Sequence, residues 1–153
     1  MDGVVKFQCK SCKSIVVVDF DDKAVNCGIC GAVCQVPLPM SAGVVIDDFL
    51  ILNLLGAGGM GNVYLAHEFS LDRKVALKIL KDSISKNTEV RSSFIKEARS
   101  VASLNHPNII QAYKVGLEDD GVLFFAMEYV EGQTLQDQLK QNAMLEEKLV
   151  LDI

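Results

Sequence analysis

The chain has 153 residues, of which 50% are hydrophobic, so it can bury the core of one ordinary domain or of two small ones. Its formal net charge of −5 gives no overall basic field, which argues against nucleic acid or an anionic membrane as a partner attracted by charge alone. The first residues lack a basic start followed by an apolar stretch, and the most apolar segment, 44–55, is interrupted by Asp47, Asp48 and Asn53. We therefore expect a cytoplasmic protein without a signal peptide or a membrane span.

All five cysteines lie between residues 9 and 34, and four of them form two C-x-x-C pairs separated by fourteen residues. Two residues between thiols let a tight turn aim both sulfurs at one ion, and two such turns complete the tetrahedron that Zn²⁺ accepts. The apolar segments 14–20 and 23–25 predict short strands that are too few to bury a core, so the metal would supply the missing stability. The predicted zinc ligands are Cys9, Cys12, Cys27 and Cys30.

The alternatives to zinc are a redox pair or ordinary small apolar residues, and the two matched spacings favour zinc. Disulfides are the weaker explanation in a reducing compartment. Four thiolates leave no open position for water or substrate, so the site is predicted to be structural. Cys34 is left over: it can replace Cys30 or be a free thiol, and we expect the free thiol.

Composition changes sharply after the last cysteine, which predicts a domain boundary near residue 35. Residues 36–43 combine two prolines with Ser, Ala and Gly, which is typical of a linker. We expect a zinc-ribbon-like module over 1–35, a linker over 36–46 and a second domain from residue 47.

The second domain is predicted to be α+β, with one mostly antiparallel sheet. Segments rich in Val, Ile, Leu and Tyr indicate five strands, at 49–55, 62–67, 74–80, 111–117 and 122–129.

A helix is expected from about Val90 to Asn105, with Asn87 or Thr88 as its cap and the His-Pro pair at 106–107 as a stop. After residue 132 the pattern becomes polar and helical, and a further helix is expected to begin near Leu145.

A glycine-rich segment at 56–63 lies between the first two strands and matches G-x-G-x-x-G-x-V. The chain continues after it as a strand rather than a helix, so we expect a hairpin tip and not the turn of a dinucleotide-binding fold. Glycines there let backbone N–H groups lie over phosphates. Taken alone, the motif is equally consistent with a flexible hairpin that binds no ligand.

Lys78 and Glu97 favour the phosphate-binding interpretation. Alternation along the strand places Lys78 on one face with Ala76, whose small side chain leaves room for a flat ring. Glu97 falls three residues after Phe94 on an apolar stripe of the helix, where a carboxylate needs a partner because an unpaired buried charge is costly. We expect an ion pair with Lys78; the alternatives are a lysine on an exposed strand face and a glutamate at a solvent-facing rim.

With these residues in order along the chain, 49–153 closely resembles the protein kinase family, especially its bacterial serine/threonine branch. The resemblance implies an N-lobe with hinge over 47–132, a five-stranded antiparallel sheet with helix αC, and the start of the helical C-lobe over 133–153. In this resemblance Lys78 is similar to the lysine that holds the α- and β-phosphates of ATP, and Glu97 to its ion-pair partner on helix αC.

The resemblance also implies an adenine pocket, in which Met127 is similar to the gatekeeper. The Glu128 carbonyl and the Val130 backbone would hydrogen-bond adenine, and three apolar side chains would sandwich the ring. The implied ATP-contacting residues are Leu55, Gly56, Ala57, Gly58, Gly59, Met60, Gly61, Val63, Ala76, Lys78, Glu97, Met127, Glu128 and Val130, of which Leu55, Val63 and Ala76 form the sandwich.

The family's reaction transfers the γ-phosphoryl group of Mg-ATP to a Ser or Thr hydroxyl of a protein substrate. The 153 residues contain no His-Arg-Asp, Asp-Phe-Gly or Ala-Pro-Glu segment, so we name no catalytic residue and expect the isolated chain to be inactive. The alternative function is a non-catalytic module that docks on a partner protein or regulates a partner kinase. The underside of its lobe would then be an exposed apolar patch.

Overall fold

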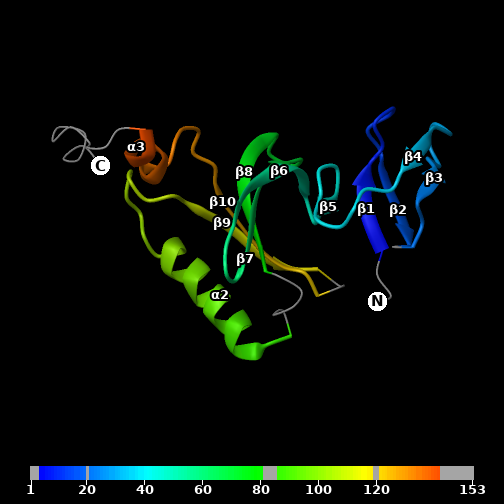
Figure 1. The fold of residues 1–153 in the computed structure, drawn as a ribbon. Coiled ribbons are helices and arrows are strands. Elements are labelled where there is room, and N and C mark those ends of the chain that lie inside the picture. The colour runs from blue at the N-terminus through cyan, green and yellow to red at the C-terminus, as the bar shows by residue number, and fades with distance from the viewer. Residues whose placement is uncertain (1–3, 20, 81–85, 119–120, 142–153) are drawn as a thin grey trace.

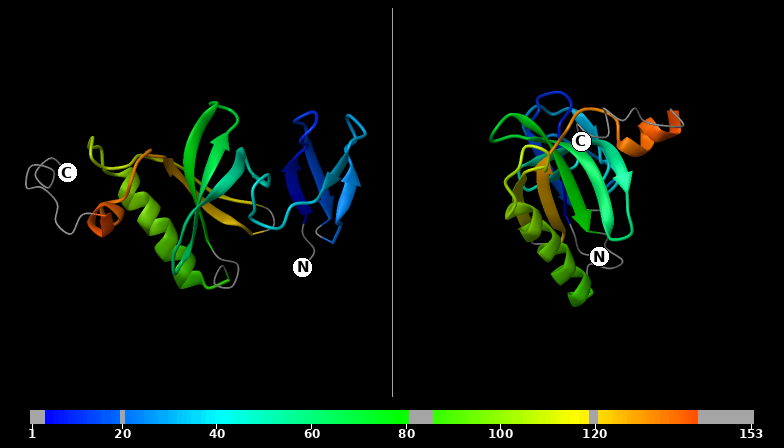
Figure 2. Two further views of the ribbon diagram at one scale, coloured as in Figure 1. Left: turned by 45° about the horizontal axis from the view of Figure 1, so that its top comes forward. Right: turned by 90° about the vertical axis from the view of Figure 1, so that its left-hand side faces the viewer.

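The computed structural model describes residues 4–19, 21–80, 86–118 and 121–141. Within these residues the strands form two small two-stranded sheets and one six-stranded antiparallel sheet (Figure 1). The six-stranded sheet lies between the N-terminal strands on one side and the two helices on the other, and a turned view gives the same arrangement (Figure 2). The fold is α+β, as predicted.

The N-terminal module consists of two antiparallel pairs, β1 with β2 and β3 with β4. The strands expected at 14–20 and 23–25 are present as β2 and β3, whereas β1 and β4 are additional. Alternation gives β1 one buried face, formed by Val5 and Phe7. The strand bounds are Val4–Gln8 for β1, Ile15–Asp19 for β2, Ala24–Asn26 for β3 and Val33–Gln35 for β4.

The large sheet has the order β5-β6-β7-β8-β10-β9, and its last five strands in sequence order are those predicted. The short strand β5 is a difference, because it makes six strands where five were expected and lies in the segment assigned to a linker. Its two residues are buried and pair with the start of β6. The bounds are Val45–Ile46 for β5, Phe49–Ala57 for β6, Gly61–Glu68 for β7, Arg73–Leu80 for β8, Ala112–Leu117 for β9 and Leu123–Glu128 for β10.

Strand β8 runs through the middle of the sheet and buries side chains on both faces. Val75 and Leu77 pack on one face with the rings of Phe49 and Phe124, whose centroids are 5.6 Å apart. The other face carries Leu80, which packs with apolar residues of helix α2. Each face therefore has its own core.

Helix α2 spans Thr88–Ala102, two to three residues earlier than expected at each end. The Asn87 side chain caps it by accepting hydrogen bonds from the backbone N–H groups of Glu89 (2.9 Å) and Val90 (3.2 Å). Helix α3 spans Leu135–Gln141, and the helix expected near residue 145 lies outside the described residues. Among the described helices, none is both long and apolar enough to cross a membrane.

The two edges of the large sheet are joined by a side-chain contact. Lys114 of the edge strand β9 donates a hydrogen bond to the carboxylate of Asp47, in the turn between β5 and β6 at the opposite edge. This hydrogen bond raises the pKa of Lys114. The Lys114 ammonium therefore stays charged through the neutral pH range.

Gly116→Ala is expected to destabilise the large sheet. Gly116 lies in β9 opposite Phe124 of β10, and an added Cβ would overlap the buried Phe124 ring. Overpacking of this kind costs about 1–3 kcal/mol, so the thermal unfolding midpoint should fall by several degrees.

The matched control is Gly59→Ala, because an added Cβ there meets nothing within 4 Å. Differential scanning calorimetry should place this control near the unmodified chain. Equal midpoints for the two variants would contradict the packing of Gly116 against Phe124.

Candidate nucleotide and metal sites

The glycine-rich segment is the tip of the β6–β7 hairpin, as predicted. Gly56 pairs with Val63, and the Gly58 backbone N–H donates to the Gly61 carbonyl at 2.8 Å. The chain continues directly into β7 (Figure 1). The strand after the loop excludes the strand-to-helix geometry of a dinucleotide-binding turn.

The glycines of this loop serve two different purposes. An added Cβ at Gly61 would overlap the carbonyl oxygen of Ile79, so this glycine lets β7 approach β8 closely. At Gly56 and Gly59 an added Cβ would meet nothing within 4 Å. Those two positions leave space above the sheet that a ligand can occupy.

Lys78 and Glu97 form the predicted ion pair. The Lys78 ammonium donates to both carboxylate oxygens of Glu97, at 2.7 and 2.9 Å, and lies 5.6 Å from the centroid of the Phe94 ring. Phe94 and Ala98 are buried against the sheet and fix the orientation of α2, which brings Glu97 to the edge of that contact. The packing of α2 on the sheet therefore places Glu97 beside Lys78.

The burial of Glu97 differs from the sequence-based expectation. Its side chain is 42% exposed, whereas that of Lys78 is 16% exposed. Helix α2 ends at Ala102, so Leu104 does not extend the apolar stripe and is 53% exposed. Because solvent reaches the Glu97 carboxylate, neutralising a buried charge contributes little to the stability of this ion pair. Its main effect is to orient the Lys78 ammonium.

A hollow of about 330 Å³ lies beneath the hairpin tip. Its lining combines the Lys78 ammonium with a glycine-rich backbone, and among the residues that the structure describes it contains no carboxylate side chain. Backbone N–H groups and a cation suit a phosphate, because both interact favourably with negative charge. The lining residues are Gly56, Ala57, Gly58, Gly59, Met60, Gly61, Val63 and Lys78.

The other residues expected to contact ATP lie outside this hollow. Ala76 is buried and pairs with Met127 across β8 and β10, as expected for neighbours at a ring site. The Glu128 backbone N–H donates to the Gln111 carbonyl at 2.8 Å. Val130 is 64% exposed, and Leu55 is also exposed. Their contacts with adenine stay a prediction.

The sulfur atoms of Cys9, Cys12, Cys27 and Cys30 all lie within 4.8 Å of one another. Two of the separations are 3.6 Å, between Cys12 and Cys27, and 3.9 Å, between Cys9 and Cys30. A tetrahedron with Zn–S bonds of about 2.3 Å has S–S edges of about 3.8 Å. These two separations match such edges, so the four thiols fit a zinc ion.

The two C-x-x-C segments have the same backbone hydrogen bonds. In the first segment, the Cys9 N–H donates to the Ser14 carbonyl and the Lys13 N–H to the Cys9 carbonyl. In the second, the Cys27 N–H donates to the Ala32 carbonyl and the Gly31 N–H to the Cys27 carbonyl. The fourth residue after each first cysteine has positive φ, 64° at Lys13 and 72° at Gly31. Two equivalent turns thus present the four thiols.

The protonation of these thiols differs within the cluster. The Ser14 hydroxyl, 3.3 Å from the Cys27 sulfur, lowers the pKa of Cys27 to about 6. The Ala32 backbone lowers the pKa of Cys30, but the adjacent thiols of Cys12 and Cys27 outweigh it and raise that pKa to about 11. Like groups that share a site cannot all ionise by themselves, and a divalent cation is what lets all four become thiolates.

Cys34 lies beside the cluster rather than in it. It is buried, and its thiol donates to the Cys9 sulfur at 3.6 Å. Burial raises the pKa of Cys34, which keeps this thiol protonated at neutral pH. This arrangement agrees with the expected free thiol. The spacing alone does not reveal its hydrogen bond with Cys9, one of the four predicted ligands.

A comparison with known protein families matches residues 49–153 to the protein kinase domain. The chain is 46% identical over 105 residues to serine/threonine-protein kinase PrkC of Bacillus subtilis, which covers 69% of this chain and 16% of that protein. It is 41% identical over 105 residues to serine/threonine-protein kinase PknJ of Mycobacterium tuberculosis, with 69% and 18% covered. The chain thus spans less than one fifth of the length of these relatives.

Solved structures give the same result for the fold. The crystal structure of the M. tuberculosis PknI kinase domain matches with a TM-score of 0.61 and 31% identity, covering 73% of this chain and 45% of that chain. A structure described as PpkA-294 apo form matches with a TM-score of 0.61 and 25% identity, covering 76% and 47%.

Proposed function

Because the chain belongs to the protein kinase domain family, we propose that it carries the ATP-binding lobe of a serine/threonine kinase. The observation that supports this most directly is the paired contact of Lys78 with both oxygens of Glu97, beside the hollow under the glycine-rich tip. An oriented cation beneath a glycine-rich backbone has the chemistry needed to hold the phosphates of a nucleotide.

When bound, Mg-ATP would supply the γ-phosphoryl group that the family transfers to a Ser or Thr hydroxyl of a protein. Lys78 would contact the α- and β-phosphates, and Glu97 would keep its ammonium in place. Backbone N–H groups of residues 56–61 would lie over the phosphates, since the glycines leave that space open. Val63 and Ala76 would contact the adenine ring from β7 and β8.

We also propose that these 153 residues alone bind nucleotide without transferring phosphate. Their sequence includes neither the carboxylate that orients the acceptor hydroxyl nor the residues that hold magnesium in this family. Phosphoryl transfer depends on positioning and on charge stabilisation by these groups, so binding and catalysis should separate.

Titration of the ¹⁵N-labelled chain with Mg-ATP tests this proposal. NMR shift changes should concentrate in residues 56–63 and around Lys78, and incubation with γ-labelled ATP and a Ser/Thr-containing protein should give no label above background. Shifts centred elsewhere would contradict the nucleotide site, and robust labelling of the protein would contradict the separation of binding from catalysis.

The N-terminal module is proposed to hold one structural zinc ion through its four clustered thiols. Four thiolate ligands leave no coordination site for substrate, and a reducing compartment such as the cytoplasm, where we place the chain, keeps such thiols from forming disulfides. Zinc therefore contributes stability rather than reaction chemistry.

A second role, docking on a partner kinase or other protein, is favoured by exposed apolar side chains near the end of α2 and along β9. They include Leu104, Val115 and Leu117. Val115 and Leu117 pair with Phe125 and Leu123, so they lie on the face of the sheet that carries α2. An apolar surface of this kind suits contact with another folded domain.

A further inference from the structure

The cysteine module and the large sheet share one hydrophobic core. Val5 and Phe7 of β1 belong to the same buried cluster as Val44, Phe49 and Phe124 of the second domain. The cluster also contains the ligand Cys9, which is fully buried. The module is thus packed on the lobe, although the sequence predicts a linker over 36–46 between the two.

Backbone hydrogen bonds continue across this junction. Phe7 forms a bridge with Val44, and the Gln8 N–H donates to the Gly43 carbonyl at 3.1 Å. The Gly43 N–H then donates to the Ile51 carbonyl, and the Ile51 N–H to the Val44 carbonyl, both at 2.8 Å. The module is therefore connected to β6 by paired backbone.

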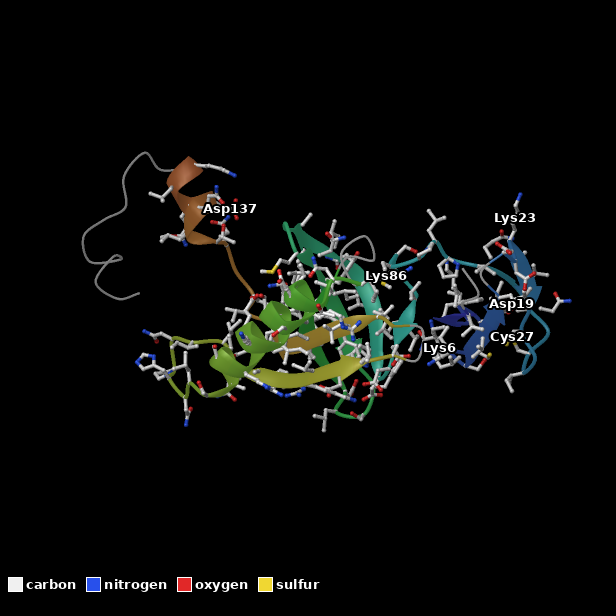
Figure 3. The ribbon with its side chains drawn as sticks, turned by 90° about the horizontal axis from the view of Figure 1, so that it is seen from below. Lys6, Asp19, Lys23, Cys27, Lys86 and Asp137 are labelled. Carbon is white, nitrogen blue, oxygen red and sulfur yellow. The ribbon has the colours of Figure 1, made fainter. Side chains whose placement is uncertain are left out.

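An ion pair ties the other side of β1 to the lobe. The Lys6 ammonium lies 2.9 Å from the Glu118 carboxylate at the end of β9, and Figure 3 shows Lys6 where the module meets the large sheet. The Glu118 side chain is only 19% exposed, so this contact is shielded from solvent more than an ordinary surface pair. Two separate elements of the lobe thus contact β1.

Strand β6 connects this junction to the nucleotide site. Phe49 and Ile51 at its start are buried in the shared core, whereas residues 53–57 at its end are exposed and lead into the hairpin tip. A single strand is therefore anchored at the module and carries Gly56 and Ala57 of the hollow at its far end. When the first half of β6 is fixed by packing, the second half and the hairpin tip can adopt fewer positions.

We infer that zinc bound by the cysteine module is an effector of nucleotide binding, acting through the packed junction of β1 and β5 on strand β6. The inference rests on the proposed nucleotide site. The module is too small to fold without its metal, so losing zinc unfolds β1 and uncovers Val44 and Phe49. The start of β6 then loses its packing, and the loop above the phosphates becomes less ordered.

The experiment uses the full chain with one equivalent of Zn²⁺, and then with a chelator that binds Zn²⁺ but not Mg²⁺. Removing zinc is expected to weaken binding of a fluorescent ATP analogue about tenfold, a typical size for coupling between two sites. Amide hydrogen exchange at Ile51 and its neighbours in β6 should speed up in the same sample. Both changes should reverse when Zn²⁺ is added back.

Two matched variants test the route. Val44→Ala alters the lobe side of the junction, whereas Val33→Ala makes the same change at a 70%-exposed position of β4, away from β1. Both should bind one zinc per chain, because neither residue is a ligand. Val44→Ala should reduce the effect of zinc on nucleotide binding, and Val33→Ala should preserve it.

The inference is overturned if chelation leaves both β6 exchange and nucleotide affinity unchanged, or if the two variants respond equally to zinc. A zinc-loaded chain that binds no nucleotide would instead refute the proposed function, and the exchange rates in β6 would still decide whether zinc orders that strand. The two failures are therefore distinguishable.

Discussion

Cys27→Ser is expected to abolish zinc binding and to unfold the N-terminal module. Cys27 is buried, and the hydrogen bond with Ser14 lowers the pKa of its thiol to about 6. Structural zinc contributes about 10–16 kcal/mol to the folding of small zinc-binding peptides, far more than the few buried side chains of this module can replace. Metal analysis should fall from about one zinc per chain to none, and the β1–β4 amide signals should lose dispersion.

The control is Cys34→Ala, which removes a cysteine of the same module that lies outside the four-sulfur cluster. This variant should retain about one zinc per chain and lose the hydrogen bonds of the Cys34 thiol with the Cys9 sulfur and the Ala32 carbonyl, a loss of about 1 kcal/mol. A folded, metal-free module, or equal zinc loss in the two variants, would contradict the assignment of the ligands.

Lys78→Met is expected to weaken nucleotide binding at least tenfold while the chain stays folded. Methionine keeps most of the apolar length of the side chain but removes the charge that faces the hollow, and losing one charge-assisted contact with phosphate costs about 1.5–3 kcal/mol. Isothermal titration calorimetry with Mg-ATP measures the loss.

The matched control is Lys74→Met. Lys74 lies on the same strand about 13 Å from Lys78, since strands rise about 3.3 Å per residue, and it pairs with Glu131 in an exposed ion pair. Its removal should leave the affinity within about twofold. An equal loss of nucleotide affinity in both variants would indicate a general effect of net charge. An unchanged affinity in Lys78→Met would show that Lys78 does not contact the nucleotide.

The elements that sequence reasoning locates are those with strong local signals. Alternation fixes the strands of the large sheet, and the glycine spacing between two strands fixes the hairpin tip. The ion pair of Lys78 and Glu97 is predicted because the two-residue period of a strand places Lys78 beside Ala76, and the 3.6-residue period of a helix places Glu97 beside Phe94. Its partners are predicted correctly, but the exposure of Glu97 is not, because that depends on which side chains of α2 pack on the sheet: Phe94 and Ala98 are buried, and Glu97 lies at the rim of their contact.

The junction between module and lobe is the main feature that the sequence does not reveal. Residues 44–46 are apolar, but the prolines and glycine before them make the whole segment read as a linker. The alternation of Val5 and Phe7 in β1 is a usable signal for a buried face. What covers that face is a long-range contact, and neither spacing nor composition specifies it.

The contact between Lys114 and Asp47 has a consequence for how the protein avoids association. An open sheet presents two rims of unpaired backbone groups, on which strands of other molecules can add and start aggregation. Here the sheet is curled far enough for its first and last strands to meet through a cation and an anion, as in an incompletely sealed barrel. The charged side chains of Lys114 and Asp47 therefore disfavour the addition of a further strand at either edge of the sheet.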